Sequence, residues 1–115
     1  MIVASLSLHH LELSERPVFA RRALHALAPG GQLIAAEVIV DESPLVRERQ
    51  YELWRRFMTA HGEDGDAWYQ KHLHKDHPVE IAAWVSTLMD TGFVSAGCFC
   101  RYLNFAIIGG GRAAI

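Results

Sequence analysis

The sequence predicts an α/β domain, in which helices pack against a largely parallel β-sheet. Two observations carry this prediction. Apolar runs typical of buried strands alternate with segments whose apolar residues recur at helical spacing, and the chain ends in two strand-like runs joined by a very short turn. The chain has 115 residues, half of them hydrophobic, which is enough for one core but too few for two ordinary domains.

The first half of the chain predicts a strand, a helix and a second strand. The apolar run "IVASLSL" predicts a largely buried strand over residues 2–8. Apolar residues at helical spacing between Pro17 and Leu27 predict a helix, which the turn "LAPGG" ends. "QLIAAEVIV", residues 32–40, predicts the second strand. Because this order favours a right-handed crossover, we expect the two strands to be parallel.

The second half predicts helices followed by a hairpin. Ser43 and Pro44 form a cap and first-turn pair for a helix. The apolar stripe of this helix comprises Val46, Leu53, Trp54 and Phe57. The polar stretch "YQKHLHKDHP" is expected to be partly helical, and a further helix begins at Pro78 and ends at Gly92. "FVSAGCFCRY" and "NFAIIGG" predict an antiparallel pair that turns around Leu103.

Two features near the C-terminus predict no site. Cys98 and Cys100 are one residue apart in a predicted strand, a poor geometry for a disulfide, and no second cysteine pair is available for zinc. We expect them to be reduced packing residues. The glycines from Gly109 to Gly111 have no helix after them, so they predict a flexible terminal turn and no cradle for a cofactor.

Composition excludes several classes of partner. The net charge is −2 and basic residues are interspersed with acids, as in "RERQYELWRR", so the chain offers no broad attraction to nucleic acid or an anionic membrane. No apolar stretch reaches the roughly 18 residues that a membrane span needs. The start also lacks the basic region and cleavage signal of a secretory peptide. We therefore expect a cytoplasmic protein with no nucleic-acid and no membrane partner.

Two histidines follow the first predicted strand, and a glutamate interrupts the second. His9 and His10 directly follow the first strand, where one imidazole can face a cleft and the other can face protein. The alternative is that both only hydrogen-bond the loop to Glu12. Glu37 interrupts the second strand, and a carboxylate there is costly unless it is paired. Its alternatives are a functional group, an ion pair with an arginine or a contact to a backbone N–H.

The segment "HLHKDH" invites a metal hypothesis, because it supplies His72, His74, Asp76 and His77. No single regular backbone aligns all three histidines, and no distant fourth ligand is evident. We therefore predict no metal site. A loop that gathers these histidines around zinc or nickel remains the alternative.

The order of elements resembles the C-terminal half of the class I S-adenosylmethionine-dependent methyltransferase fold. "IVASLSLHHLE" is similar to the fourth strand of that family, and "ALHALAPGGQLIAAEVI" to the helix, turn and fifth strand that follow. "LMDTGFVSAGCFCRYLNFAIIGGGR" is similar to the final helix and hairpin. The resemblance implies half of a Rossmann-like methyltransferase sheet, with parallel strands, a closing antiparallel hairpin and flanking helices. Residues 1–115 would then form a single partial domain.

The family's N-terminal half has no counterpart in this sequence. That half carries a glycine-rich loop for the cofactor's methionine portion and an acidic residue for its ribose. The sequence therefore resembles a C-terminal fragment, a half-gene product or an incomplete enzyme. S-adenosylmethionine is the expected cofactor of the complete fold. We expect this chain alone to be inactive and to bind it no more tightly than about 1 mM, or roughly 4 kcal/mol.

The resemblance also implies roles for named residues. Ser5 and Leu6 match the family's cofactor-contacting segment, and His9 or His10 would orient a substrate or accept its proton, with Glu37 near the same cleft. In the family, the region before the last helix often covers a small-molecule substrate. We therefore expect a substrate pocket shaped by Trp68, Tyr69 and His72.

The absence of an N-terminal half predicts a partner. In the family's sheet the fourth strand lies between the first and the fifth, so residues 2–8 would form an unpaired edge, which promotes pairing with another chain. The expected partner is the missing half or a second copy, giving a homo-oligomer. A noncatalytic oligomerising module derived from this fold and, less favoured, a His-rich metal-binding protein are the alternatives to a methyltransferase part with a small-molecule acceptor.

Overall fold

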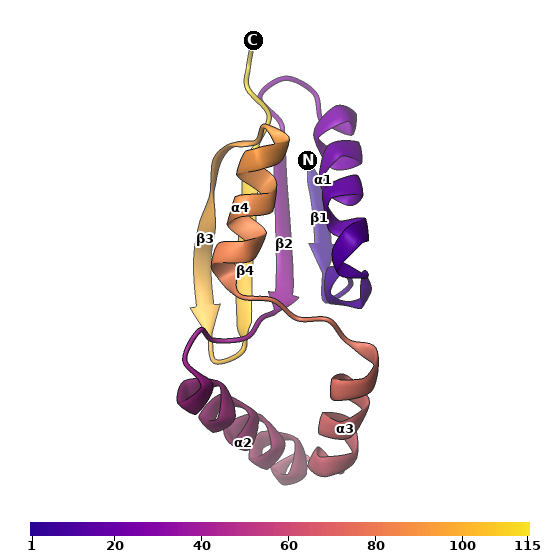
Figure 1. Cartoon of the computed structure of the whole chain (residues 1–115), viewed down its shortest axis with the longest axis vertical. Helices are drawn as coiled ribbons and strands as arrows, with labels where there is room; N and C mark the ends of the chain where they lie inside the picture. Colours follow the sequence, from indigo (N-terminus) through magenta and orange to yellow (C-terminus); the bar gives the residue numbers. More distant parts are fainter.

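Four strands form one mixed sheet in the order β1-β2-β4-β3 (Figure 1). The computed structural model describes all residues, Met1–Ile115. β1 (Ile2–Ser5) is parallel to β2 (Gln32–Val38), β4 (Phe105–Gly111) is antiparallel to β2, and β3 (Val94–Tyr102) is antiparallel to β4. The predicted α/β class, with its parallel pair and closing antiparallel hairpin, is confirmed.

The helices form two groups. α1 (Arg16–Ala26) and α4 (Ile81–Thr91) lie side by side on one face of the sheet (Figure 1). α2 (Pro44–Ala60) and α3 (Gly65–Lys75) pack on each other beyond the carboxyl ends of β1 and β2. The molecule is therefore elongated, with extents of 49 × 24 × 21 Å.

The core fills the space between the sheet and the first helix pair. One cluster, between α1, α4 and β2, consists of Ala20, Ala23, Leu27, Leu33, Leu88 and Phe93. A second, nearer the carboxyl ends of the parallel strands, consists of Leu8, Ala35, Ile39, Trp84, Ala106 and Ile108. Trp84 is only 1% exposed, so α4 is anchored directly above the central strands. Leu8 of the turn that follows β1 belongs to this second cluster, so the turn is packed against the core.

The opposite face of the sheet has no helix over it (Figure 1). Large apolar side chains are exposed there, and they include Val3 at 68%, Tyr102 at 74% and Ile107 at 37%. β1 is also an edge strand, because β2 is its only partner in the sheet. The unpaired edge expected from the sequence is thus present. We call the surface formed by Val3, Leu6, Tyr102 and Ile107 the open face.

The first strand is shorter than predicted. It ends at Ser5 and does not reach residue 8, because Leu6 has a φ of 50° in the left-handed region and Leu8–His10 form a 3₁₀ turn. The prediction that this segment is largely buried is wrong for Val3, which is 68% exposed, and for Leu6, which is 47% exposed.

The predicted apolar stripe of α2 is also wrong. Val46 and Phe57 are 44% and 56% exposed, while the buried residues of this helix are Gln50 and Tyr51. The reason is that α2 packs on α3 and not on the sheet. Its start is as predicted, since the Ser43 hydroxyl accepts a hydrogen bond from the Val46 N–H at 3.4 Å.

Two predictions near the C-terminus need correction. Gly109–Gly111 belong to β4 and are buried, so they are not a terminal turn. A side chain at Gly109 would overlap the Leu33 carbonyl, which explains the glycine. Cys98 and Cys100 are free, but both are exposed and do not pack, in a strand whose register shifts between them.

Gly92, with a φ of 114°, ends α4 as expected. None of the helices is both long and apolar enough to span a bilayer.

Candidate active site

The turn after β1 is built around a buried carboxylate. Glu37, on β2, is 0% exposed and accepts hydrogen bonds from the backbone N–H groups of Ser7, Leu8 and His9, at 3.2, 2.7 and 3.1 Å. A buried carboxylate without partners would be very costly, so these bonds explain how an acid is tolerated in an apolar strand. They also fix the backbone of the turn that carries the two histidines.

Glu37 also orients His9. Its Oε2 lies 2.8 Å from Nδ1 of His9. His9 is only 6% exposed. Backbone N–H groups can only donate, so both Glu37 oxygens act as acceptors, and the hydrogen-bond network assigns the ring proton to Nδ1. Nε2 of His9 is left with a free lone pair, which can accept a proton or bind a cation.

Asp76, the residue that caps the C-terminus of α3, connects three histidines. Its Oδ1 lies 2.8 Å from Nδ1 of His10, and its Oδ2 lies 2.6 Å from Nδ1 of His72. The same Oδ2 is 3.6 Å from Nε2 of His9. Sequence reasoning considered Asp76 only as part of a metal hypothesis. Its spacing of four residues from His72 on a helix was the available signal.

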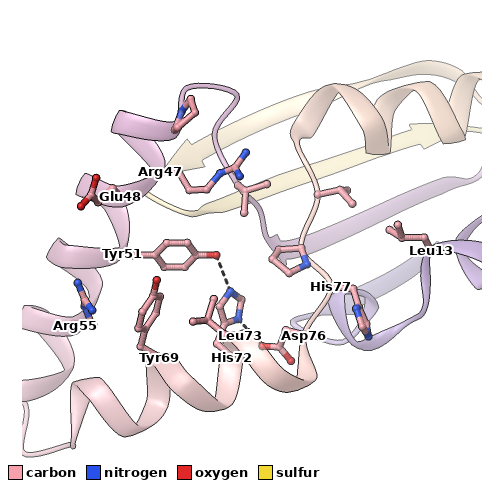
Figure 2. A pocket seen from close by; sticks show the side chains of 14 residues that line it. Leu13, Arg47, Glu48, Tyr51, Arg55, Tyr69, His72, Leu73, Asp76 and His77 are labelled. Carbon is pink, nitrogen blue, oxygen red and sulfur yellow. Dashed lines mark hydrogen bonds and ion pairs between the residues drawn. The ribbon is translucent and has the colours of Figure 1, made fainter.

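The chain of polar groups continues to α2. The Tyr51 hydroxyl lies 2.9 Å from Nε2 of His72 (Figure 2). Burial raises the pKa of Tyr51 to about 12, so its hydroxyl is neutral at physiological pH. Tyr51 thus holds His72, and His72 in turn holds the Asp76 oxygen that lies near His9.

Backbone contacts join the two segments that meet at the site. The His77 N–H donates to the His9 carbonyl at 2.7 Å. The buried guanidinium of Arg16 donates to the carbonyls of Leu11 and His77 and lies 4.9 Å from the centre of the Trp84 ring. Burial lowers the pKa of Arg16, and the charge of Glu37 opposes this shift. The histidine turn and the segment after α3 are therefore held in register.

A cavity of about 780 Å³ lies between α2, α3 and the segment before α4 (Figure 2). Tyr51, Tyr69, His72, Asp76 and His77 line it, and the side chains of Arg47, Glu48 and Arg55 stand along its α2 wall. The cavity thus combines aromatic surfaces with polar groups, and Asp76 connects it to the histidine turn.

The structure brings together most, but not all, of the residues singled out in the sequence. His9, His10, Glu37 and His72 belong to one network through Asp76. Tyr69 lines the cavity, with its ring centre 5.1 Å from that of Tyr51.

The remaining candidates lie elsewhere. Trp68 is 41% exposed, donates to Glu63 at 3.1 Å and does not line the cavity. Ser5 and Leu6 are exposed at the carboxyl end of β1, and Leu6 borders a shallow apolar pocket on the open face. His74 is exposed, so the metal cluster considered in the sequence, with His72, His74 and His77, does not form as one group.

Comparisons of sequence find nothing: no protein-family profile matches the chain, and no curated protein does. Solved structures do match. Human N-acetylserotonin methyltransferase in complex with SAM superimposes with a TM-score of 0.62 at 14% identity, covering 96% of this chain and 28% of that one. The fold is that of the C-terminal part of S-adenosylmethionine-dependent methyltransferases. The resemblance seen in the sequence is thus confirmed at the level of fold.

Two further methyltransferase structures give the same result. PigF with SAH matches with a TM-score of 0.64 at 17% identity, over 96% of this chain and 29% of that chain. An O-methyltransferase family protein from Burkholderia thailandensis matches with a TM-score of 0.65 at 12% identity, over 97% and 30%. The chain therefore spans less than a third of the length of these methyltransferases.

Proposed function

We propose that this chain is the C-terminal part of an S-adenosylmethionine-dependent O-methyltransferase for a small-molecule acceptor, and that His9 is its general base. The observation that carries the proposal is the arrangement Glu37–His9, in which a buried carboxylate orients a buried imidazole and leaves Nε2 free. It stands at the carboxyl end of a parallel strand, where open α/β sheets bind their ligands. His10 is a weaker candidate, since its side chain is 59% exposed.

In methyl transfer to a hydroxyl, these residues have one task, which is to accept the proton of the acceptor. The cofactor, when bound, supplies a methyl group activated by its sulfonium. A hydroxyl acceptor must lose a proton, which His9 accepts at Nε2 while Glu37 stabilises the resulting imidazolium through the Nδ1–H. Asp76, 3.6 Å from Nε2, adds a second negative group beside that charge.

This chain provides only part of a binding site for the cofactor. Ser5 and Leu6 are exposed at the carboxyl end of β1, beside the apolar pocket that Leu6 borders with Ala36. These residues can form one wall of a cofactor site. The glycine-rich backbone and the acid for the ribose are not among the residues present, so we propose that the isolated chain binds no S-adenosylmethionine more tightly than about 1 mM.

The cavity supports a small-molecule acceptor. Its volume of about 780 Å³ is in the range of drug-sized ligand sites, and the rings of Tyr51 and Tyr69 offer apolar contact. We propose that an acceptor enters between α2 and α3 and presents its hydroxyl past Asp76 to His9. Trp68 does not line this pocket.

The open face supports a partner. Exposed apolar residues on the uncovered side of the sheet and the unpaired edge of β1 are surfaces on which another element can pack. We propose that the N-terminal part of the methyltransferase fold covers them in the complete enzyme. A second copy would occupy them when the chain is alone, which makes a homo-oligomer the expected isolated state.

The same surface favours the second candidate function, a noncatalytic oligomerising module. Methyl transfer distinguishes the two candidates, since a module of this kind would show none with any N-terminal half. A cytoplasmic location stays a prediction.

The test is a reconstitution. The chain is extended upstream, or a matching N-terminal half is supplied, and methyl transfer to a hydroxylated acceptor is followed. His9→Ala is expected to lower turnover about 100-fold or more and to leave cofactor affinity within a few-fold. His25→Ala, an exposed position on α1, is the matched control. A folded His9→Ala variant with near-parental turnover would remove the proposed base.

A further inference from the structure

Three potential metal ligands converge from two distant parts of the chain. His9 and His10 come from the turn after β1, and Asp76 comes from the end of α3. Each offers one ligand atom, and these three atoms lie within 4.8 Å of one another. The two imidazole rings are stacked obliquely, with centres 4.1 Å apart and planes at 43°. The cluster thus brings two nitrogens and one carboxylate oxygen close together.

We propose that His9, His10 and Asp76 form a zinc-binding site. Zinc binds nitrogen and oxygen ligands at about 2.0–2.2 Å, so two ligands of a tetrahedral ion are roughly 3.3–3.6 Å apart. Oδ1 of Asp76 lies 2.8 Å from Nδ1 of His10, and Oδ2 lies 3.6 Å from Nε2 of His9, so each histidine has a carboxylate oxygen near this spacing. Small side-chain adjustments are enough to admit the ion. Because the His10 side chain is 59% exposed, water can take the fourth position.

Outer hydrogen bonds already orient two of the three ligands. A histidine that binds zinc usually donates its other ring N–H to a carboxylate or carbonyl. His9 does so through Nδ1 to the buried Glu37, at 2.8 Å. Asp76 is held by His72 at 2.6 Å, and His72 is held in turn by Tyr51 at 2.9 Å. The donors therefore need little reorganisation to bind an ion.

This site differs from the metal hypothesis that the segment "HLHKDH" suggests. Only Asp76 is shared as a ligand, His72 moves to the outer hydrogen-bonded layer, and His74 is exposed and takes no part. Sequence spacing could not predict this site, because the two histidines and the carboxylate are far apart in the sequence and come together only in the fold.

The site belongs to this chain alone, so it does not rest on the proposed methyltransferase function. It has a consequence for that function, because zinc would use the same Nε2 of His9 that accepts the acceptor's proton. Zinc and proton acceptance are then mutually exclusive, and the ion inhibits methyl transfer in the complete enzyme.

The experiment uses the whole chain after treatment with a chelator. Zinc is titrated by calorimetry, and cobalt is titrated as a spectroscopic probe, whose visible absorption reports nitrogen and oxygen ligation. We expect one ion per chain. His10→Ala and Asp76→Asn are each expected to weaken binding at least about ten-fold. Glu37→Gln, where the protein remains folded, is expected to weaken it about 10- to 100-fold.

His74→Ala is the matched control, because His74 lies on the same segment, is exposed and has no contact with the cluster. It is expected to bind zinc as the parent does. His10 is exposed, so its substitution leaves the core intact and circular dichroism can verify the fold. No zinc binding by the folded parent overturns the proposal. So does a His10→Ala variant with parental affinity, or a loss that follows His74→Ala.

Discussion

The two faces of the sheet differ in polarity and burial at the carboxyl end of β1. On the inner side, Glu37 is fully buried and accepts hydrogen bonds from three backbone N–H groups and from His9. On the outer side, Val3 and Tyr102 are 68% and 74% exposed and β1 has an unpaired edge. The carboxylate on the inner side has its hydrogen-bond partners within this chain, whereas the outer side has exposed apolar surface.

This contrast indicates which properties belong to the chain and which need a partner. Hydrogen-bonded polar groups that are buried resist change, because each one left without a partner costs free energy. Exposed apolar groups are solvated in the folded chain much as in the unfolded one, so they add little to its stability, but they favour association. We therefore expect substitutions on the inner side to change stability and substitutions on the open face to change assembly.

The largest effect is expected at Glu37. Glu37→Ala removes the acceptor of three backbone N–H groups and of His9, and each buried donor left without a partner costs about 1–3 kcal/mol. We expect the free energy of unfolding to fall by about 3–5 kcal/mol, measured by urea denaturation. Glu42→Ala, at an exposed acid after β2, is the control. A loss below about 1 kcal/mol would contradict the role given to Glu37.

The next effect is expected on the open face. Ile107→Lys places a charge among exposed apolar groups, and we expect it to weaken self-association at least about ten-fold, or roughly 1.4 kcal/mol. Light scattering at tens of micromolar gives the measurement. Lys substitution at Leu45, which is 78% exposed on α2 and outside the open face, is the control. A monomeric parent at these concentrations would count against a partner surface here.

A smaller effect is expected from Tyr51→Phe. The hydroxyl bonds His72 at 2.9 Å, so its loss is expected to cost about 1 kcal/mol near neutral pH. Folding raises the pKa of Tyr51 from 10.0 to about 12. The stabilisation that depends on the neutral hydroxyl is therefore fully present below pH 10 and is lost as the pH rises towards 12.

The difference between parent and Tyr51→Phe should accordingly shrink across this pH window. Unfolding midpoints in urea at successive pH values measure it, with Tyr102→Phe, at an exposed position, as the control. A constant difference from pH 9 to pH 12 would show that Tyr51 is not buried as described.

The smallest effect is expected at the cysteines. Cys98 and Cys100 are free and exposed, so Cys98→Ser and Cys100→Ser should each change the free energy of unfolding by less than about 0.5 kcal/mol. Thermal unfolding gives the measurement. A loss of several kcal/mol at either position would restore the packing role that the sequence suggested.

Local patterns predicted the elements well where one segment decides its own structure. Ser43 caps α2 and Gly92 ends α4, because cap chemistry depends on only a few neighbouring residues. The prediction failed where tertiary contacts decide. The stripe with Phe57 is apolar at helical spacing, but α2 has no sheet to cover, so Tyr51 is buried against α3 instead.

The site shows the same limit. His9, His10 and Glu37 could be named from the sequence, because the histidines directly follow an apolar strand and a carboxylate inside an apolar strand is unusual. Their connection through Asp76 could not, since it depends on how the end of α3 returns to the turn after β1. The choice of His9 over His10 likewise required their burial, which adjacent residues in a sequence do not reveal.

The most direct test of the central claim is the affinity for S-adenosylmethionine, measured by calorimetry with the chain alone and with a matching N-terminal half. We predict no binding tighter than about 1 mM for the folded chain alone and micromolar binding for the two parts together. Micromolar binding by the chain alone, or none by the reassembled fold, would contradict the account of this protein as one part of a methyltransferase.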